Sequence, residues 1–318
     1  MSSKKLVKPL GFTEIRGGGP TPVADIVLVH GLGGHPEDTW TYLSNTTTHS
    51  RRSRRRRFFG RERRENTTPV RPKIFWPREL LAQDVQNCRI FTYGYDSDVF
   101  NFLGSVNRTN LYQHATDLLV ALTDQRRETS TSPIIFVAHS LGGILVKDVL
   151  KQSQDSQYKP DLRSVYQYTH GIVFLGTPHR GSDWASLAKN LAVFALGKAN
   201  TRSLRSLEVD SAELQRLMDN FSVMLKADKV KVCSFVESLG MTGIPGFSGK
   251  VVKDFSSRIG DAAEISQTLH ADHRNMCKYS GPEDANYQKV LAVLKGFVRE
   301  IETQTRSVTT TSGSHETM

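Results

Sequence analysis

The sequence has 318 residues, of which 38% are hydrophobic and 23% charged, an ordinary globular composition that excludes collagen-like, coiled-coil and wholly disordered chains. The formal net charge is +10, but nine arginines and two glutamates between residues 51 and 65 account for +7 of it. The remainder of the chain carries only +3, so an extended surface for nucleic acid is not expected.

The cysteine content and the hydropathy point to an intracellular protein without a membrane span. Cys88, Cys233 and Cys277 are too few and too scattered for a disulfide framework or a Cys-rich zinc site. The N-terminus lacks the apolar stretch of a secretory signal, and no window approaches the roughly 18 apolar residues of a spanning helix. Any contact with a membrane is therefore expected to be peripheral.

Short apolar runs rich in β-branched residues alternate with segments of helical periodicity. The runs have few polar interruptions, as expected for strands covered on both faces, and lie at 25–29, 89–93, 134–138, 171–175 and 230–236. Helical spacing of apolar residues is found at 111–122, 144–150 and 214–225. This alternation predicts an α/β fold with a mostly parallel, doubly wound sheet.

Composition also predicts the domain boundaries. We expect one α/β domain over residues 20–302, preceded by an N-terminal tail (1–19) and followed by a disordered, Thr- and Ser-rich tail (303–318). Residues 44–71, rich in Ser, Thr, Asn and Arg, are expected to be a disordered surface insertion. The stretch from Trp184 to Asn220 mixes helical and polar segments and is expected to form a partial helical lid over the end of the sheet.

The clearest chemical signal is P-I-I-F-V-A-H-S-L-G-G-I-L-V at residues 133–146. An apolar strand runs into Ser140, Gly142 and Gly143 keep the turn uncrowded, and a helix begins at once. This is the context of a nucleophile elbow, which holds a serine above the sheet edge at a helix N-terminus. The first glycine of G-x-S-x-G is here Ala138, the next smallest residue. The alternative is a glycine-rich turn with an incidental serine.

A second glycine turn follows the earlier strand, in I-V-L-V-H-G-L-G-G-H-P at residues 26–36. Acyl transfer needs two N–H donors facing the developing oxyanion, and a His-Gly turn supplies one of them in lipase-like hydrolases. We expect the backbone N–H groups of Leu32 and Leu141 to be these donors. A phosphate loop is excluded by Pro36, which stands where the dinucleotide fingerprint needs its last glycine, and by the absence of G-K-[ST].

The general base of such a site is a histidine late in the chain, because in lipase-like hydrolases the catalytic residues follow one another in the order serine, acid, histidine. The histidines after Ser140 that are neither too early nor in the tail are His270 and His273, in L-H-A-D-H-R-N-M-C-K-Y. His273 is preferred because it lies in a polar loop, whereas His270 follows Leu269 and suits a packed structural role.

The acid that orients the histidine is expected just after a late strand. Glu237 directly follows the run 230–236, while Asp254 and Asp183 are alternatives after other apolar segments. Each of the three can equally be a helix cap or a surface charge. A further motif, T-P-H-R-G-S at residues 177–182, has no chemical role that its spacing reveals, and His179 and Arg180 are expected to be structural.

The motif series resembles the SERAC family and its fungal SesB-related relatives, whose members are described as lipases or esterases with an α/β-hydrolase fold. The resemblance rests on G-L-G-G-H-P-E-D-T-W, F-W-P-R-E-L-L, F-T-Y-G-Y-D-S-D-V, V-A-H-S-L-G-G-I-L-V-K, F-L-G-T-P-H-R-G-S and A-D-H-R-N-M-C-K-Y. It covers roughly residues 20–300 apart from the arginine insertion, which is unlike the family pattern.

The resemblance implies a serine hydrolase of lipid-type or other acyl esters, with Ser140 as nucleophile, His273 as base and Glu237 as the favoured acid. It also implies mitochondrial or endoplasmic-reticulum association; the cytoplasm and the nucleus are the alternatives. The expected mechanism uses no metal and no organic cofactor. The alternative function is a catalytically silent module in fungal self-recognition or immune-type signalling. The arginine run favours a solvated insertion or a targeting signal over a reader of nucleic acid.

Overall fold

The computed structural model describes residues 6–44, 72–97, 108–179, 190, 193, 211–227, 230–244, 247–252, 256–262 and 264–312. Two predicted features, nearly all of the insertion 44–71 and most of the lid 184–220, lie outside these residues, as do the candidate acids Asp183 and Asp254.

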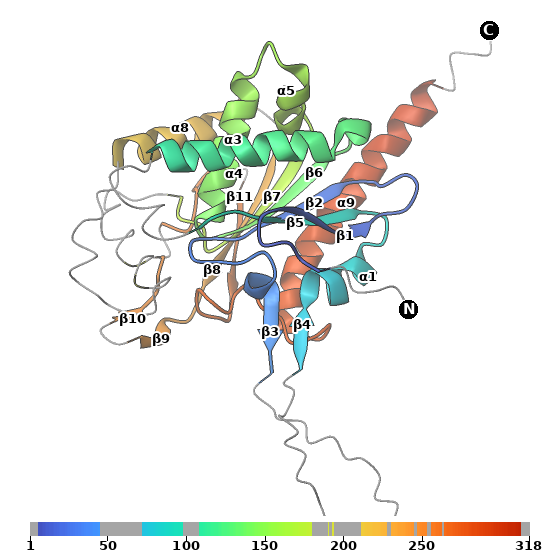
Figure 1. Ribbon diagram of the computed structural model, residues 1–318. Helices are drawn as coiled ribbons and strands as arrows, with labels where there is room; N and C mark the ends of the chain where they lie inside the picture. Colours follow the sequence, from blue (N-terminus) through green and yellow to red (C-terminus); the bar gives the residue numbers. More distant parts are fainter. Residues whose placement is uncertain are drawn as a thin grey trace, which may run out of the picture.

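The centre of the molecule is a seven-stranded sheet (Figure 1). In spatial order its strands are β1 (Gly11–Gly17), β5 (Arg89–Gly94), β2 (Asp25–Val29), β6 (Ile134–His139), β7 (Thr169–Leu175), β8 (Lys231–Glu237) and β11 (Glu264–Leu269). All neighbours pair in parallel except β1, which is antiparallel to β5. The predicted α/β class and the mostly parallel sheet are thus confirmed.

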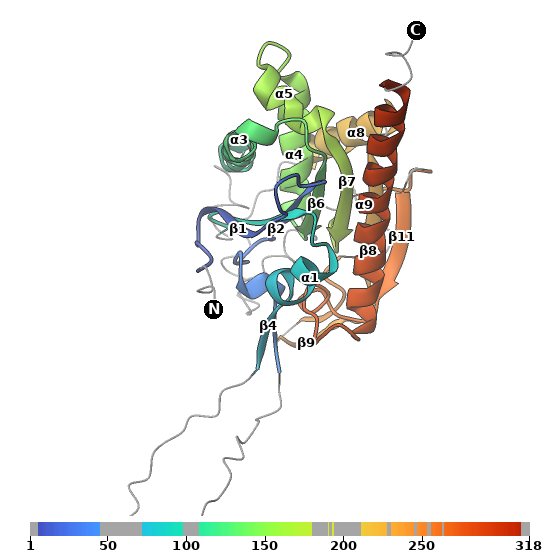
Figure 2. The ribbon, with the colours of Figure 1, turned by 90° about the vertical axis from the view of Figure 1, so that its right-hand side faces the viewer.

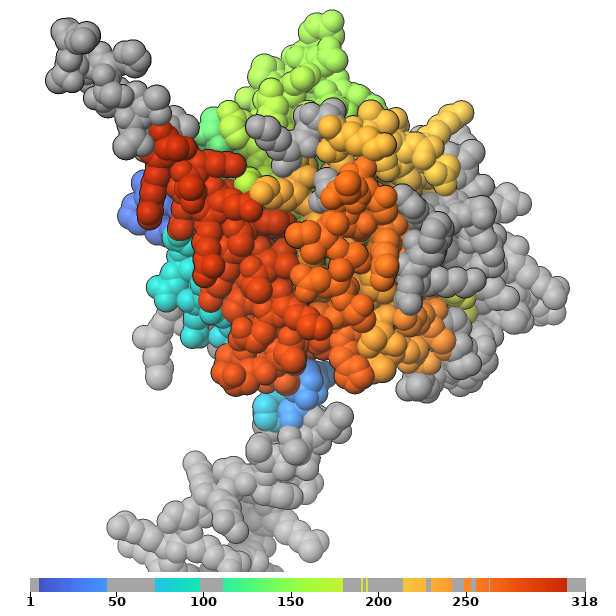
Figure 3. Space-filling view, turned by 180° about the vertical axis from the view of Figure 1, so that it is seen from behind, coloured from blue at the N-terminus to red at the C-terminus, as the bar shows by residue number. Residues whose placement is uncertain are grey.

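Helices cover both faces of this sheet. One apolar cluster joins the sheet to α3 (Arg108–Gln125), α4 (Gly142–Asp155), α5 (Pro160–Gln167) and α8 (Ser211–Ala227). A second cluster joins the opposite face to α9 (Ala285–Ser312) and to the segment formed by η2 (Pro77–Leu81) and α1 (Ala82–Asp84). The view from behind shows α9 lying across that face (Figure 3). Because β2 and β6 are buried on both faces, their sequences read as continuous apolar runs.

Four short strands lie outside the main sheet. β3 (Thr41–Leu43) pairs antiparallel with β4 (Lys73–Phe75), and β9 (Met241–Ile244) pairs with β10 (Phe247–Gly249). The 3-10 turn η1 (Asp38–Trp40) leads directly into β3; a second, η3 (Arg127–Thr129), follows α3. The β3–β4 arm projects below the body of the molecule in Figure 2. It marks the place in the fold where the arginine-rich residues are inserted.

Both ends of the chain differ from the sequence expectation. The predicted N-terminal tail contains β1, whose Phe12 ring lies 4.8 Å from that of Tyr93 on β5. Only part of this edge strand is buried, so its apolar signal is weak. At the other end α9 continues to Ser312, so the first ten residues of the predicted disordered tail (303–312) are helical. Ile301 is buried, and after Gly296 no glycine or proline occurs in the helix before Gly313.

Candidate active site

Ser140 lies in the tight turn between β6 and α4. It has a φ of 54°, a left-handed conformation found at no other non-glycine residue among those described. The turn is crowded: a Cβ at Gly142 would lie 2.3 Å from the carbonyl oxygen of His30, and one at Gly143 would lie 2.2 Å from Thr177 Oγ1. Only glycine fits at these two positions, which explains why the strained serine is followed by Leu-Gly-Gly.

His273 and Glu237 meet Ser140 at the carboxyl ends of their strands. His273, in the loop after β11, places Nε2 3.0 Å from Ser140 Oγ. Its Nδ1 lies 3.2 Å from Oε2 of Glu237, the last residue of β8. The parallel register pairs Leu269 with Glu237, so both strands end at the same level. The second carboxyl oxygen, Oε1, accepts a hydrogen bond of 2.9 Å from the Val252 N–H. The structure thus brings together the serine, histidine and glutamate that the sequence favours.

This group of side chains is closed to solvent. Ser140, His273 and Glu237 each have 0% of their surface exposed. The sequence predicts that Ser140 lies at the edge of the sheet, and the structure places it there. Its side chain, however, is buried and does not contact solvent. Substrate would reach the hydroxyl only after neighbouring groups move.

His139, the residue before the serine, fixes the loop that carries His273. Its Nε2 lies 2.9 Å from the backbone carbonyl oxygen of His273, so this nitrogen carries the proton and donates it. Burial, together with the nearby His273, lowers the pKa of His139 to about 3. The ring therefore stays neutral and remains a hydrogen-bond donor.

The glycine turn after β2 lies directly against the serine. A Cβ on Gly31 would lie 2.7 Å from Ser140 Cβ, so Leu32 follows a residue in contact with the Ser140 turn. Leu141 is the N-cap residue of α4. The turn is held by Tyr95, whose hydroxyl donates to the His30 carbonyl over 2.8 Å and whose ring stacks on the imidazole at 4.4 Å. The assignment of the Leu32 and Leu141 N–H groups as oxyanion donors stays a prediction.

The T-P-H-R-G-S segment follows β7, the neighbour of β6, and part of it reaches the same site. Gly176 has a φ of 60°, and a Cβ there would lie 2.9 Å from both Cε1 and Nδ1 of His273. Thr177 Oγ1 donates to the Ser140 carbonyl over 3.0 Å. His179 Nδ1 lies 2.7 Å from Nζ of Lys147 on α4. β6 and β7 are adjacent parallel strands, so the segments that follow them lie at the same edge of the sheet. The sequence places both segments after apolar runs, but its spacing does not show that the two strands are neighbours.

The remaining candidates lie elsewhere. His270 is exposed; its N–H donates to Asn286 Oδ1 over 2.9 Å, and its Nδ1 lies 3.4 Å from Ser238 Oγ. Within the described ranges, no group of three or more His, Cys, Asp or Glu side chains is arranged to hold a metal ion. The three cysteines are buried free thiols. Of the helices described, none is long and apolar enough to cross a bilayer.

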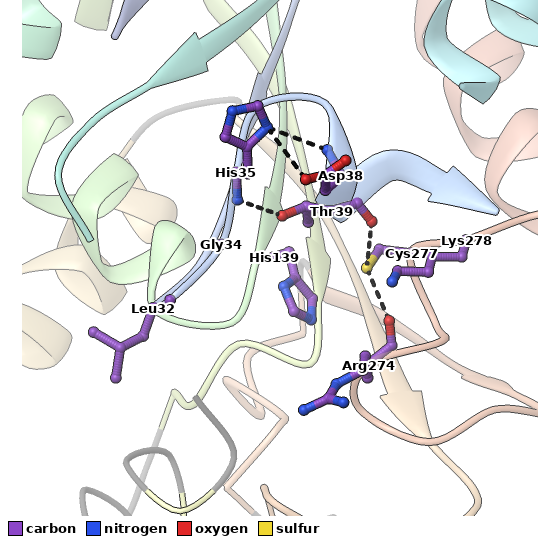
Figure 4. A pocket seen from close by; sticks show the side chains of 10 residues that line it. Leu32, Gly34, His35, Asp38, Thr39, His139, Arg274, Cys277 and Lys278 are labelled. Carbon is purple, nitrogen blue, oxygen red and sulfur yellow. Dashed lines mark hydrogen bonds and ion pairs between the residues drawn. The ribbon is translucent and has the colours of Figure 1, made fainter. Parts of the chain in front are cut away.

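A cavity of about 240 Å³ is lined by chain neighbours of the serine and histidine, His139 and Arg274, and not by Ser140 or His273 themselves (Figure 4). Its walls are the loop 32–39, His139, and the residues Arg274, Cys277 and Lys278 that follow His273. It therefore touches the proposed oxyanion turn on one side and the histidine loop on the other.

The mostly parallel sheet, the helices on both its faces and the serine turn after β6 define an α/β-hydrolase fold. Among solved structures, the mature lipase BlEst2 of Bacillus licheniformis is similar, with a TM-score of 0.51 and 16% identity over 85% of this chain and 94% of that one. This likeness shows the fold.

Among curated proteins, the chain is similar to Protein SERAC1 of Danio rerio (28% identity; 86% of this chain, 39% of that one), of Homo sapiens (27%; 87% and 39%) and of Bos taurus (26%; 86% and 38%). These relatives confirm the resemblance to the SERAC family. The chain spans about two fifths of the length of the relatives it matches. No family model matches the sequence.

Proposed function

We propose that the protein is a serine hydrolase that cleaves carboxylic esters, of a lipid type by family resemblance, through an acyl-enzyme on Ser140. The observation that carries the proposal is the chain of contacts from Ser140 Oγ to His273 Nε2 at 3.0 Å and from His273 Nδ1 to Glu237 Oε2 at 3.2 Å. A serine hydroxyl is a weak nucleophile on its own, and an imidazole oriented by a carboxylate is the group that activates it.

In the proposed reaction His273 Nε2 takes the proton of Ser140 as Oγ attacks the ester carbonyl. The carbonyl oxygen gains negative charge, which the N–H groups of Leu32 and Leu141 stabilise. The C–O bond to the alcohol then breaks, and the imidazolium returns its proton to the leaving oxygen. Water, deprotonated by the same imidazole, attacks the acyl-enzyme; the bond from the acyl carbon to Ser140 Oγ breaks, the imidazolium returns its proton to Oγ, and the acid is released. Glu237 stabilises the imidazolium in both halves of the cycle.

The complete burial of Ser140 and His273 favours a second function, a silent module that keeps the hydrolase fold without turnover. The two functions differ in whether the hydroxyl can be reached from solution. Mitochondrial or endoplasmic-reticulum association and peripheral membrane contact stay predictions from the resemblance, as does the lipid nature of the ester.

Labelling with a fluorophosphonate probe tests the proposal. We expect the parent protein to be labelled, Ser140→Ala to lose all labelling, and His273→Ala to lose at least about 10⁴-fold in labelling rate, because the serine is then without its base. Ser266→Ala removes an exposed hydroxyl on β11 and is the control, with labelling equal to the parent.

Hydrolysis of nitrophenyl esters of graded acyl length then separates a lipase from a short-chain esterase. Equal labelling of the parent and Ser140→Ala would refute the nucleophile assignment. A folded parent that neither labels nor hydrolyses any ester would favour the silent module.

A further inference from the structure

Lys147 is a buried amine that the proposed reaction does not use. It lies on α4, the helix that begins just after the serine turn, and only 1% of its surface is exposed. Its Nζ lies 5.5 Å from the centre of the Phe174 ring on β7 and 5.0 Å from that of Phe221 on α8. Burial lowers the pKa of Lys147 well below its ordinary value, and the negative charge of Glu264 opposes this only in part. An amine is costly to keep in such surroundings, so its polar partner is informative.

That partner is His179, a buried residue of the T-P-H-R-G-S segment after β7. Nζ of Lys147 lies 2.7 Å from His179 Nδ1 and also donates to Met218 Sδ over 2.9 Å. With Nζ as the donor, Nδ1 is the acceptor, and the ring keeps its proton on Nε2, 3.4 Å from Ser234 Oγ. The ring also meets that of Phe174 edge to face at 4.6 Å. The imidazole is therefore fixed in both position and orientation.

The turn that carries His179 contacts the proposed nucleophile and base. Gly176 lies so close to the His273 ring that a Cβ there would be 2.9 Å from two ring atoms. Thr177 Oγ1 donates to the Ser140 carbonyl over 3.0 Å. The turn is thus joined to α4 twice, by this hydrogen bond at the start of the helix and by the amine–imidazole contact further along it.

The same turn reaches the segment that holds the proposed acid. The His179 N–H donates to the carbonyl of Ser256. Ser256 and Val252 both lie between β10 and β11, and the Val252 N–H donates to Glu237 Oε1 over 2.9 Å. A displacement of the turn would therefore be transmitted toward all three members of the proposed triad.

We propose that Lys147 and His179 form a buried positioning pair, which fixes the turn 176–179 against α4 and thereby aligns Ser140 Oγ with His273 Nε2. Both residues act through others and do not touch the substrate. The inference rests on the proposed function, because it gives the pair a role in aligning the proposed triad. Apolar side chains would fill the same space at lower cost, but they would lack the directional contact that sets the register of the turn against the helix.

Removal of the amine tests the inference. Lys147→Met keeps the length of the side chain and suits the apolar surroundings of Nζ, so the melting temperature should not fall. We expect kcat for a nitrophenyl ester to fall about tenfold with KM unchanged, because the serine and its base are misaligned while the substrate surface is intact. His179→Leu should lower kcat equally, and the double variant should lose no more than either single one, since the two residues act as a unit.

A conservative variant and a matched control complete the kinetic test. In His179→Asn the amide oxygen takes the place of Nδ1 as acceptor for the amine, so kcat should return to within about threefold of the parent. Lys151 lies one turn further along α4, is partly exposed and pairs with Asp155, so Lys151→Met should leave kcat unchanged. An unchanged kcat in Lys147→Met, or a loss in His179→Asn as large as in His179→Leu, would overturn the inference.

A measurement without turnover separates the failure of this inference from the failure of the proposed function. The proposed geometry places a proton on His273 Nδ1, facing Glu237, and a proton held against a carboxylate gives a resolved downfield NMR line. The line is assigned by its loss in His273→Gln. It should move upfield in Lys147→Met and stay in place in Lys151→Met. If no ester is hydrolysed but this shift is found, the positioning pair stands and the hydrolase assignment fails. If esters are hydrolysed and the line does not move, the inference is overturned.

Discussion

Thr177 connects the turn after β7 to the turn of the proposed nucleophile through its hydrogen bond to the Ser140 carbonyl. Thr177→Val keeps the shape of the side chain and removes the donor, which costs about 1 kcal/mol for a buried hydrogen bond. Because the lost contact fixes the serine backbone, we expect kcat for a nitrophenyl ester to fall about five- to tenfold with KM unchanged. Thr177→Ser, which retains the hydroxyl, should restore kcat.

Thr169→Val is the matched control for this prediction. Thr169 begins the same strand, is buried, and donates to the Val165 carbonyl over 2.6 Å at the end of β7 away from the serine. Its replacement should lower the melting temperature and leave kcat unchanged. Equal loss of kcat in the two valine variants would mean that Thr177 acts only through general stability.

At the scale of single residues, the sequence indicated the candidate site residues whose chemical type and position along the chain both fit a serine, acid and histidine order. Ser140 follows from its turn, His273 from its late position in a polar loop, and Glu237 from the strand that it ends. His139 and Thr177 were not predicted as neighbours of the site. Their contacts depend on which strands are adjacent and on their register, and neither property is visible in local spacing.

At the scale of elements, a buried ion cluster joins β2, β5 and the segment after α3 at the end of the sheet away from the site. Asp25, fully buried, accepts from Arg89 at 2.6 and 2.7 Å and from Arg126 at 2.6 Å. Removing one partner of a buried ion pair leaves an uncompensated charge. We expect Asp25→Ala to lower the free energy of unfolding in urea by about 3–5 kcal/mol, with the activity per folded molecule retained.

The exposed pair of Asp124 and Arg127 is the control for Asp25. Its atoms are also 2.6 Å apart, but the two side chains are 63% and 80% exposed. Asp124→Ala should therefore change the free energy of unfolding by at most about 1 kcal/mol. A similar small effect of Asp25→Ala would contradict a structural role for the buried cluster.

Elements were predictable in proportion to their burial. The five central strands are apolar over most of their length and were found from sequence, whereas the edge strands β1 and β11 were not. β11 exposes Ile265 and buries mainly Leu269, so it lacks both a continuous apolar run and a clean alternation. The helix α9 was also missed, since its polar second half resembles a tail.

At the scale of the whole molecule, two buried histidines make stability depend on pH. Burial lowers the pKa of His30 to about 4, and burial with His273 lowers that of His139 to about 3. Unfolding restores a pKa near 6.5, so below that pH the unfolded chain binds protons that the folded chain does not. We expect the free energy of unfolding to fall as the pH is lowered from 7 to about 4.

Urea denaturation across this range measures the effect. His30→Phe keeps an aromatic ring beside Tyr95 and removes one titrating group, so its unfolding free energy should vary less steeply with pH than that of the parent. A parent whose stability is constant or rises on acidification would contradict the prediction.

The parts of the proposed triad are made at different times during translation. Ser140 precedes His273 by 133 residues, and the strands that carry the proposed acid and base occupy the far edge of the sheet, β8 and β11. A growing polypeptide on the ribosome thus displays the serine while its partners have not yet been synthesised. The proposed hydrolysis therefore requires that the outermost strand, β11, has already joined the sheet.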